Sequence, residues 1–213
     1  MGGVSRVLDV VTLEGNHVRL EPLSLSHVSA LVQAATPLRE TYTYTEVPAT
    51  EAGMQRYVET ALARQETGTA LPFATIDRKS GRVVGSTRFG NIEFWDWPAG
   101  SPHQRGAHLP DVVEIGWTWL APDAQRTAIN TEAKLLMLTH AFETWRVHRV
   151  WIRTDSRNER SRRAIDRLGA HLDGVIRAAQ VAYDGAIRDT ATYSIIDSEW
   201  PAVKARLRGL LER

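Results

Sequence analysis

The sequence has no cysteine among its 213 residues, which excludes disulfide frameworks, thiol nucleophiles and zinc sites built on thiolates. It also lacks any apolar run near the ~20 residues that span a bilayer, and its first eleven residues lack the apolar core of a secretory signal. We therefore expect no membrane association and a cytoplasmic location. The formal net charge of +1 argues against nucleic acid as a partner.

The composition is ordinary for a globular protein, with 43% hydrophobic and 24% charged residues. A chain of this length buries roughly 70% of its unfolded surface, so it needs no covalent or metal staple. No linker, repeat or low-complexity tract divides it. We expect a single domain over residues 1–213.

Charge is distributed unevenly along the chain. Residues 1–124 carry 10 basic and 14 acidic side chains, net −4, whereas residues 125–213 carry 16 and 11, net +5. The basic half would suit a small polyanion, and a solvated helix face is the alternative explanation. Its arginines are densest at Arg157, Arg160, Arg162, Arg163 and Arg167.

Helix and strand signals alternate and indicate an α/β (α+β) fold. Apolar spacing predicts helices after Ser24 and Thr50, over 131–144 and 159–168, and from Pro201. Turn residues after Asp77 and at 183–185 predict hairpins, so we expect a mixed, mostly antiparallel sheet flanked by helices. The expected strands are 17–22, 71–77, 83–93, 112–120, 147–155, 175–183 and 187–197.

One long irregular stretch, residues 94–111, interrupts this order, and long loops in compact domains are often functional. Trp95 and Trp97 lie there beside proline and glycine. They could form an adjustable wall over a pocket, contact a second copy in a homodimer, or simply pack onto the sheet.

A strand-to-helix junction lies between Trp119 and Ala133. Such a junction aims free backbone N–H groups and the positive end of a helix at one point, where a pyrophosphate can bind. A simple capped helix, with Asn130 or Thr131 as N-cap, is the alternative.

Two strings then carry a resemblance that covers nearly the whole chain. The first is Gln125-Arg126-Thr127-Ala128-Ile129-Asn130, and the second is Asp155-Ser156-Arg157-Asn158-Glu159-Arg160-Ser161, continuing to Leu168-Gly169-Ala170. They resemble the acyl-CoA loop Gln/Arg-x-x-Gly-x-Gly/Ala and the Asn-x-x-Ser/Ala…Leu-Gly-Phe element of the GCN5-related N-acetyltransferase (GNAT) superfamily, RimJ/RimL-like branch. Ala128 and Asn130 replace the two glycines of that loop.

The resemblance implies a GNAT fold, with the sheet splayed between its fourth and fifth strands, and acetyl-CoA as co-substrate without a metal. It assigns Asn158 to the pantetheine arm and Ser161 to the region of the thioester sulfur. Because Ile165 stands where many relatives have a tyrosine acid, we expect the Ser161 hydroxyl or a relayed water to protonate the departing thiolate. The expected acetyl-CoA residues are Trp119, Leu120, Gln125, Arg126, Thr127, Ala128, Ile129, Asn130, Thr131, Asn158 and Ser161.

A base is expected because an amine must lose its charge before it attacks a thioester. Alternation over 112–119 predicts Val113, Ile115, Trp117 and Trp119 on one face, and Glu114 on the other with Gly116 and Thr118. Glu114 resembles the strand carboxylate that serves as base in related enzymes, and an ordinary solvent-facing glutamate is the alternative. The strand end at Trp119 and Leu120 would present backbone N–H groups to the thioester oxygen.

The predicted reaction is direct transfer of an acetyl group to a primary amine, either a protein N-terminus or a small molecule. The alternative is a CoA-binding regulatory or structural module that has lost catalysis. From the charge asymmetry we expect Trp95, Asp96 and Trp97 to bind a cationic acceptor, helped by Glu93 and Asp111. Acids that only make the loop soluble are the alternative. His103 and His108 lack metal-ligand spacing with carboxylates, and no metal is expected.

Overall fold

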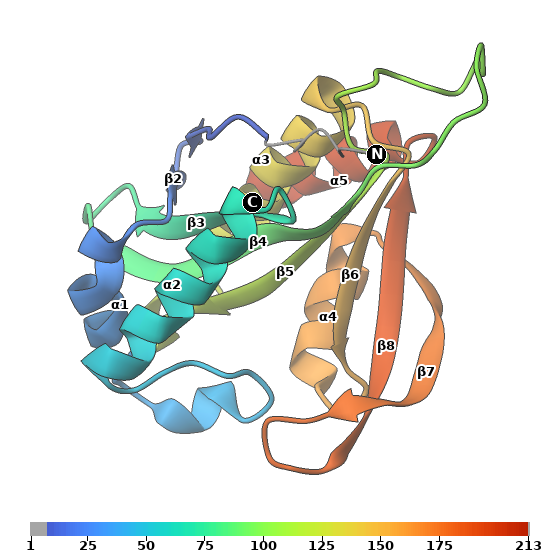
Figure 1. Cartoon of the computed structure of the whole chain (residues 1–213). Coiled ribbons are helices and arrows are strands. Elements are labelled where there is room, and N and C mark those ends of the chain that lie inside the picture. Colours follow the sequence, from blue (N-terminus) through green and yellow to red (C-terminus); the bar gives the residue numbers. More distant parts are fainter. Residues whose placement is uncertain (1–7, 213) are drawn as a thin grey trace.

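The computed structural model describes residues 8–212 and contains one eight-stranded sheet, in the order β1-β2-β3-β4-β5-β6-β8-β7 (Figure 1). All neighbouring strands are antiparallel except β5 and β6. The expected fold class is confirmed. The strands are β1 (Leu13–Glu14), β2 (Val18–Pro22), β3 (Ala70–Asp77), β4 (Val83–Glu93), β5 (Val112–Leu120), β6 (Arg149–Asp155), β7 (His171–Val181) and β8 (Ile187–Ile196).

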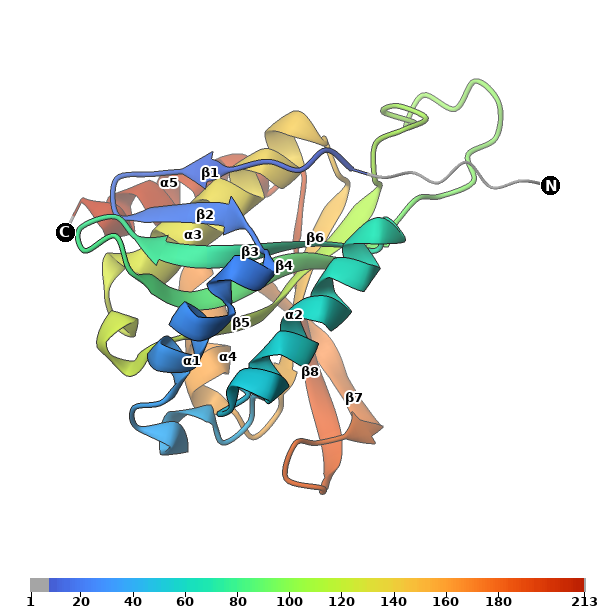
Figure 2. The ribbon, with the colours of Figure 1, turned by 60° about the vertical axis from the view of Figure 1, so that its left-hand side comes forward.

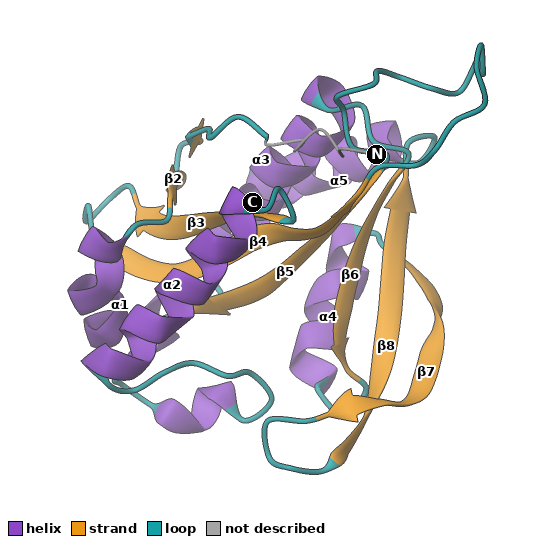
Figure 3. Ribbon diagram, in the orientation of Figure 1, coloured by secondary structure: helices purple, strands orange, loops and turns teal. Residues whose placement is uncertain are grey.

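Helices cover both faces of the sheet (Figures 2 and 3). The helices α1 and α2 pack on β3 and β4, and α3 packs on β1, β2 and α5 from the other face. The helix α4 packs against β6 and α5. The bounds are α1 (Val28–Ala35), α2 (Glu51–Glu66), α3 (Ala128–Thr139), α4 (Glu159–Leu168) and α5 (Trp200–Leu211), and a π-helical turn, His140–Thr144, extends α3.

Local capping explains where two of these helices begin. The Thr50 hydroxyl accepts a hydrogen bond from the amide of Gly53, as expected for the N-cap of α2. The helix α3 begins three residues earlier than expected, because Thr127, and not Asn130 or Thr131, is its N-cap. Its hydroxyl accepts from the amide of Ile129 at 3.3 Å.

The parallel strands β5 and β6 pair only at their beginnings, with Val112, Val113 and Glu114 opposite Arg149, Val150 and Trp151. Beyond Glu114 they diverge, as Figure 1 shows. This is the expected splay between the fourth and fifth strands, counted without the short β1. Because the strands are parallel, the helices that follow them, α3 and α4, both begin at the open end.

A bulge interrupts β5 at Trp117, whose φ is +50°. Opposite it the register moves from Ser86↔Trp119 to Arg88↔Gly116, so Trp117 and Thr118 together face one residue of β4. The extra residue reverses the alternation that follows. The expected grouping of Trp117 and Trp119 with Ile115, and of Thr118 with Glu114, is therefore wrong.

Candidate active site

Glu114 lies at the point where β5 and β6 separate, and its residue is 5% exposed. Arg153 of β6 donates to both carboxylate oxygens, from Nε at 3.3 Å and from Nη2 at 2.8 Å. Asn91 Nδ2 donates to Oε2 at 2.5 Å. Glu114 is thus neither a solvent-facing glutamate nor an unpartnered one, since three donors fix its orientation at the vertex of the splay.

Trp117 lies on the α2 side of the sheet, the side to which Glu114 also points. The Arg64 guanidinium of α2 lies 5.7 Å from the Trp117 ring, and the Arg88 guanidinium of β4 lies 5.1 Å from it. The indole covers Gly90, where a Cβ atom would approach Trp117 Cζ3 to 2.3 Å. A glycine is required at that position for this close approach.

Beneath the bulge, on the α3 side, a buried lysine connects three elements. Lys134 Nζ of α3 donates to the Thr118 hydroxyl at 2.7 Å and to the Thr87 hydroxyl at 3.3 Å. The two hydroxyls are 2.7 Å apart. Burial lowers the pKa of Lys134 from 10.5 to about 7. The Lys134 amine therefore ties α3 to the bulged part of β5 and to β4.

The start of α4 faces the open end of the splay. Asn158 is the N-cap, because its Oδ1 accepts from the amide of Ser161 at 3.0 Å, and Ser161 is half-buried in the first turn. Arg157 donates to Asp155 and to Asp184 of the β7–β8 hairpin. The Arg157 guanidinium lowers the pKa of the Asp155 carboxyl. These contacts hold the hairpin close to α4.

The start of α3 lies across from α4, after the loop that leaves β5. The Leu120 carbonyl accepts from the Tyr42 hydroxyl at 3.0 Å and from Gln125 Nε2 at 2.9 Å. Gln125 Oε1 accepts from Arg160 Nη1 of α4 at 3.1 Å. Asn130, which stands at the position of a family glycine, has a buried Oδ1 without a hydrogen-bond partner.

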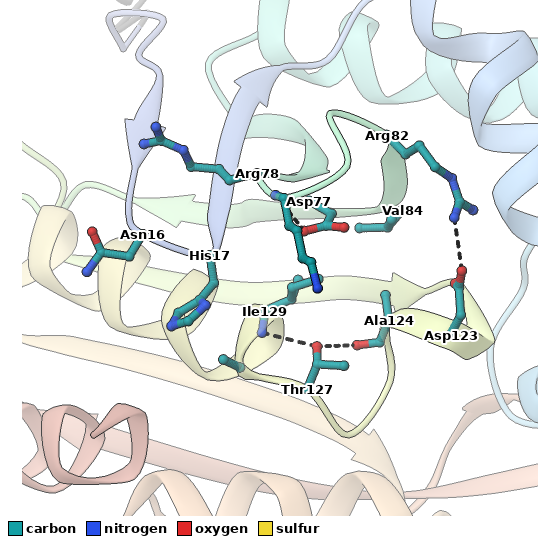
Figure 4. Close-up of a pocket in the computed structure, with 12 residues that line it drawn as sticks. Asn16, His17, Asp77, Arg78, Arg82, Val84, Asp123, Ala124, Thr127 and Ile129 are labelled. Carbon is teal, nitrogen blue, oxygen red and sulfur yellow. Dashed lines mark hydrogen bonds and ion pairs between the residues drawn. The ribbon is translucent and has the colours of Figure 1, made fainter. Parts of the chain in front are cut away.

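A groove of about 550 Å³ opens on the β4 side of the same loop (Figure 4). Thr127, Ala128 and Ile129 line it from the start of α3, and Arg78, Lys79 and Arg82 line it from the β3–β4 hairpin. Asp77 and Asp123 also line the groove and offset most of this positive charge, and the Asp123 carboxylate accepts from Arg82 at 3.1 Å. Of the residues expected to bind acetyl-CoA, three thus lie in a groove of mixed charge beside a helix start.

The Trp95/Trp97 loop lies near the first residues of β5 and is held there by a buried acid. Asp111, 6% exposed, accepts from the Trp95 amide and from Trp97 Nε1, both at 2.7 Å. His148 stacks on Trp95 with the ring centroids 5.6 Å apart. The Asp111 carboxylate is therefore engaged inside the loop, whereas Trp95 and Asp96 are exposed.

The sequence did not point to three residues of this region: Arg88, Lys134 and Arg153. Their spacing is unremarkable, and their importance arises from contacts across strands. The one local signal was a lysine at an apolar position of α3. Among residues 8–212, no group of three histidines and carboxylates could hold a metal ion, and no helix is long and apolar enough to cross a membrane.

Comparison with known proteins gives a consistent set of matches. Residues 17–171 match the family model described as an acetyltransferase (GNAT) domain. A Bacillus subtilis protein described as "Putative ribosomal N-acetyltransferase YdaF" is 33% identical over 92 residues, which are 43% of this chain and 49% of that protein. The match thus spans about half the length of that relative.

Solved structures match over nearly the whole chain. A GCN5-related N-acetyltransferase from Brucella melitensis superposes with a TM-score of 0.80 at 31% identity, covering 96% of this chain and 87% of that one. RimJ from Mycobacterium smegmatis, solved with CoA-disulfide, superposes with a TM-score of 0.76 at 21% identity, covering 94% and 95%. The second likeness concerns the fold alone.

Proposed function

Because the chain belongs to the GNAT acetyltransferase family, we propose that it is an N-acetyltransferase that moves an acetyl group from acetyl-CoA directly to a primary amine. The observation that carries this proposal is the divergence of β5 from β6, with the starts of α3 and α4 at its open end. Two helix N-termini at one edge favour a polyanionic ligand there.

The backbone and side chains at this edge fit acetyl-CoA. The Ala121 amide donates to the Val84 carbonyl at 2.7 Å, so alternation directs the Leu120 amide away from β4, into the gap beside β6. Asn158 uses Oδ1 as a cap and keeps its Nδ2 for a second contact. We assign the binding of acetyl-CoA to Trp119, Leu120, the 125–131 segment, Asn158 and Ser161. When bound, acetyl-CoA supplies the acetyl group as a thioester.

The acceptor amine would reach Glu114 from the α2 side of the sheet. Glu114 takes up the proton of the ammonium group, directly or through a water molecule, since a free amine of pKa about 8 to 10 is mostly charged at neutral pH. Arg153 and Asn91 orient the carboxylate for that step. The Ser161 hydroxyl, in the first turn of α4, would give a proton to the departing thiolate and regain one from the acceptor nitrogen as the amide forms.

The acceptor is proposed in two forms. The Bacillus subtilis relative is described as a ribosomal N-acetyltransferase, which favours an amine of a protein, and a protein N-terminus is the form we propose. Trp95, Asp96 and Trp97 of the 94–111 loop would bind it. A small-molecule amine is the second form of the same chemistry.

A CoA-binding module without catalysis is the rival function. Ile165 favours it, because this residue is 4% exposed in the core and occupies the position where many relatives carry a tyrosine acid. The replacement of the loop glycines by Ala128 and Asn130 also favours a module without catalysis.

Calorimetry with acetyl-CoA, followed by an assay for free CoA with a panel of peptides and small amines, separates these possibilities. Saturable binding together with amine-dependent CoA release supports the enzyme. Binding without release from any amine supports the module. If no binding appears at millimolar acetyl-CoA, both proposals are refuted. Glu114→Gln serves as the matched control, because it should bind acetyl-CoA but release CoA slowly.

A further inference from the structure

Arg88 stands out as a buried cation in the middle of β4. Its residue is 2% exposed, and its guanidinium lies 5.0 Å from the Tyr57 ring and 5.1 Å from the Trp117 ring. An aromatic ring attracts a cation but offers no hydrogen-bond acceptor, so neither ring satisfies the N–H groups of this guanidinium.

Two edge nitrogens of Arg88, Nε and Nη2, are buried and have no hydrogen-bond partner. No carboxylate in residues 8–212 forms an ion pair with Arg88. Burying charged donors without acceptors is costly, and most buried polar groups have partners. The two nitrogens lie on one side of the guanidinium, the side that binds a carboxylate in a bidentate way.

Arg153 provides an internal reference for that geometry. It uses the same pair of atoms, Nε and Nη2, to hold the two oxygens of Glu114. Arg88 of β4 lies opposite Gly116 of β5. Glu114 lies two residues before Gly116 in β5, on the same face of the sheet. Beside the vertex of the splay, Arg153 thus has a carboxylate partner and Arg88 has none.

We propose that the acceptor carries a carboxylate, which binds side-on to Arg88 Nε and Nη2 while its amine lies at Glu114. The inference rests on the proposed acetyl transfer and specifies its substrate class: a primary amine that also bears a carboxylate. A free amino acid and a peptide N-terminus with an acidic side chain both supply this chemistry.

Binding requires one covering ring to move, and Trp117 is the ring we assign to that movement. Tyr57 is fixed on α2 and its hydroxyl donates to Ser86 Oγ at 3.4 Å. Trp117 is half-buried on a bulge with positive φ, and its ring lies 5.7 Å from the exposed Arg64 guanidinium and 5.1 Å from the Arg88 guanidinium. Binding of a carboxylate should therefore change the fluorescence of Trp117.

The test measures binding without turnover, so that it does not depend on catalysis. The probes are 4-aminobutyrate against n-butylamine, and the dipeptide amides Asp-Ala against Asn-Ala, each titrated into the full-length protein with CoA present. Within at least one pair, the carboxylate probe should bind at least tenfold more tightly than its partner. The first pair represents free amino acids and the second represents peptide N-termini. The accompanying fluorescence change should disappear in Trp117→Phe.

Arg88→Lys and Arg88→Gln should each reduce the carboxylate preference to near unity, with the acetyl-CoA dissociation constant unchanged. Arg64→Gln is the matched control, because it removes an exposed arginine from the same indole and should keep the preference. A wild-type protein without carboxylate preference, or a preference that survives in Arg88→Lys, overturns the inference. Carboxylate binding without CoA release would instead overturn the proposed transfer and leave the Arg88 site intact.

Discussion

The buried amine of Lys134 should make the free energy of unfolding depend on pH. The residue is 5% exposed, and its amine donates to two threonine hydroxyls and has no carboxylate partner among the described residues. Burial lowers its pKa from 10.5 to about 7, so the folded protein holds this proton less tightly than the unfolded chain does. The protonated state thus opposes folding.

The sign and size of the effect follow from linkage. Each unit of pKa shift corresponds to about 1.4 kcal/mol, so the shift from 10.5 to about 7 costs roughly 5 kcal/mol below pH 7, where both states are protonated. The cost falls as the pH rises from 7 toward 10.5. Between pH 7 and 9 the wild-type protein should gain about 2 to 3 kcal/mol from Lys134 alone.

The assay is urea unfolding of the wild-type protein and of Lys134→Met at pH 6, 7, 8 and 9. Methionine keeps the unbranched chain, and Thr87 and Thr118 keep their mutual hydrogen bond. The variant should be more stable at pH 6, and its advantage should shrink above pH 7. Lys79→Met, in the exposed β3–β4 hairpin, should show no such trend. A difference between wild type and Lys134→Met that stays constant from pH 6 to 9 refutes the reasoning.

Two further changes test the rest of the site, and a third tests a histidine in the π-helical turn after α3. Glu114→Gln should lower kcat/KM by about 100-fold or more and move its acid limb to higher pH; an unchanged pH–rate profile would exclude Glu114 as the base. Asp96→Ala combined with Trp97→Ala should raise the acceptor Michaelis constant without altering acetyl-CoA affinity in calorimetry, and unchanged kinetics would leave the loop a structural or dimer contact. Burial lowers the pKa of His140 below 6.5, so stability should fall as the pH drops below 6.5; His140→Phe should flatten this loss in thermal melts between pH 7 and 5, and parallel curves would contradict it.

The fold was predictable to the extent that its signals are local. Thr50 caps α2 through its own hydroxyl, and the turn at Asp184 and Gly185 joins two strands rich in β-branched residues. Such signals depend on residues a few positions apart, so they can be recognised without knowing the fold. The start of α3 was missed because Thr127, Asn130 and Thr131 are all competent N-caps, and only the path of the preceding loop selects Thr127.

The bulge at Trp117 could not be predicted from the strand pattern. Residues 112–119 alternate well enough to suggest a regular strand, and one extra residue changes the face of every side chain after it. What maintains the bulge comes from elsewhere in the chain: Lys134 reaches Thr118 from α3, and Gly90 of β4 leaves room for the indole. Contacts between residues this far apart are set by tertiary packing, which a single sequence does not display.

The same tertiary contacts change the inference about the acceptor's charge. The charge asymmetry of the sequence suggested that a cationic acceptor meets acids of the 94–111 loop, but Asp111 is buried and committed to Trp95 and Trp97. The vertex instead presents Arg88 and Arg153 beside one carboxylate, Glu114, which Arg153 already holds. Two arginines and one carboxylate leave a net positive charge there, which would repel a purely cationic acceptor. An acceptor with both an amine and a carboxylate would neutralise Arg88 and leave its amine next to Glu114, so the electrostatics and the chemistry of acyl transfer favour the same molecule.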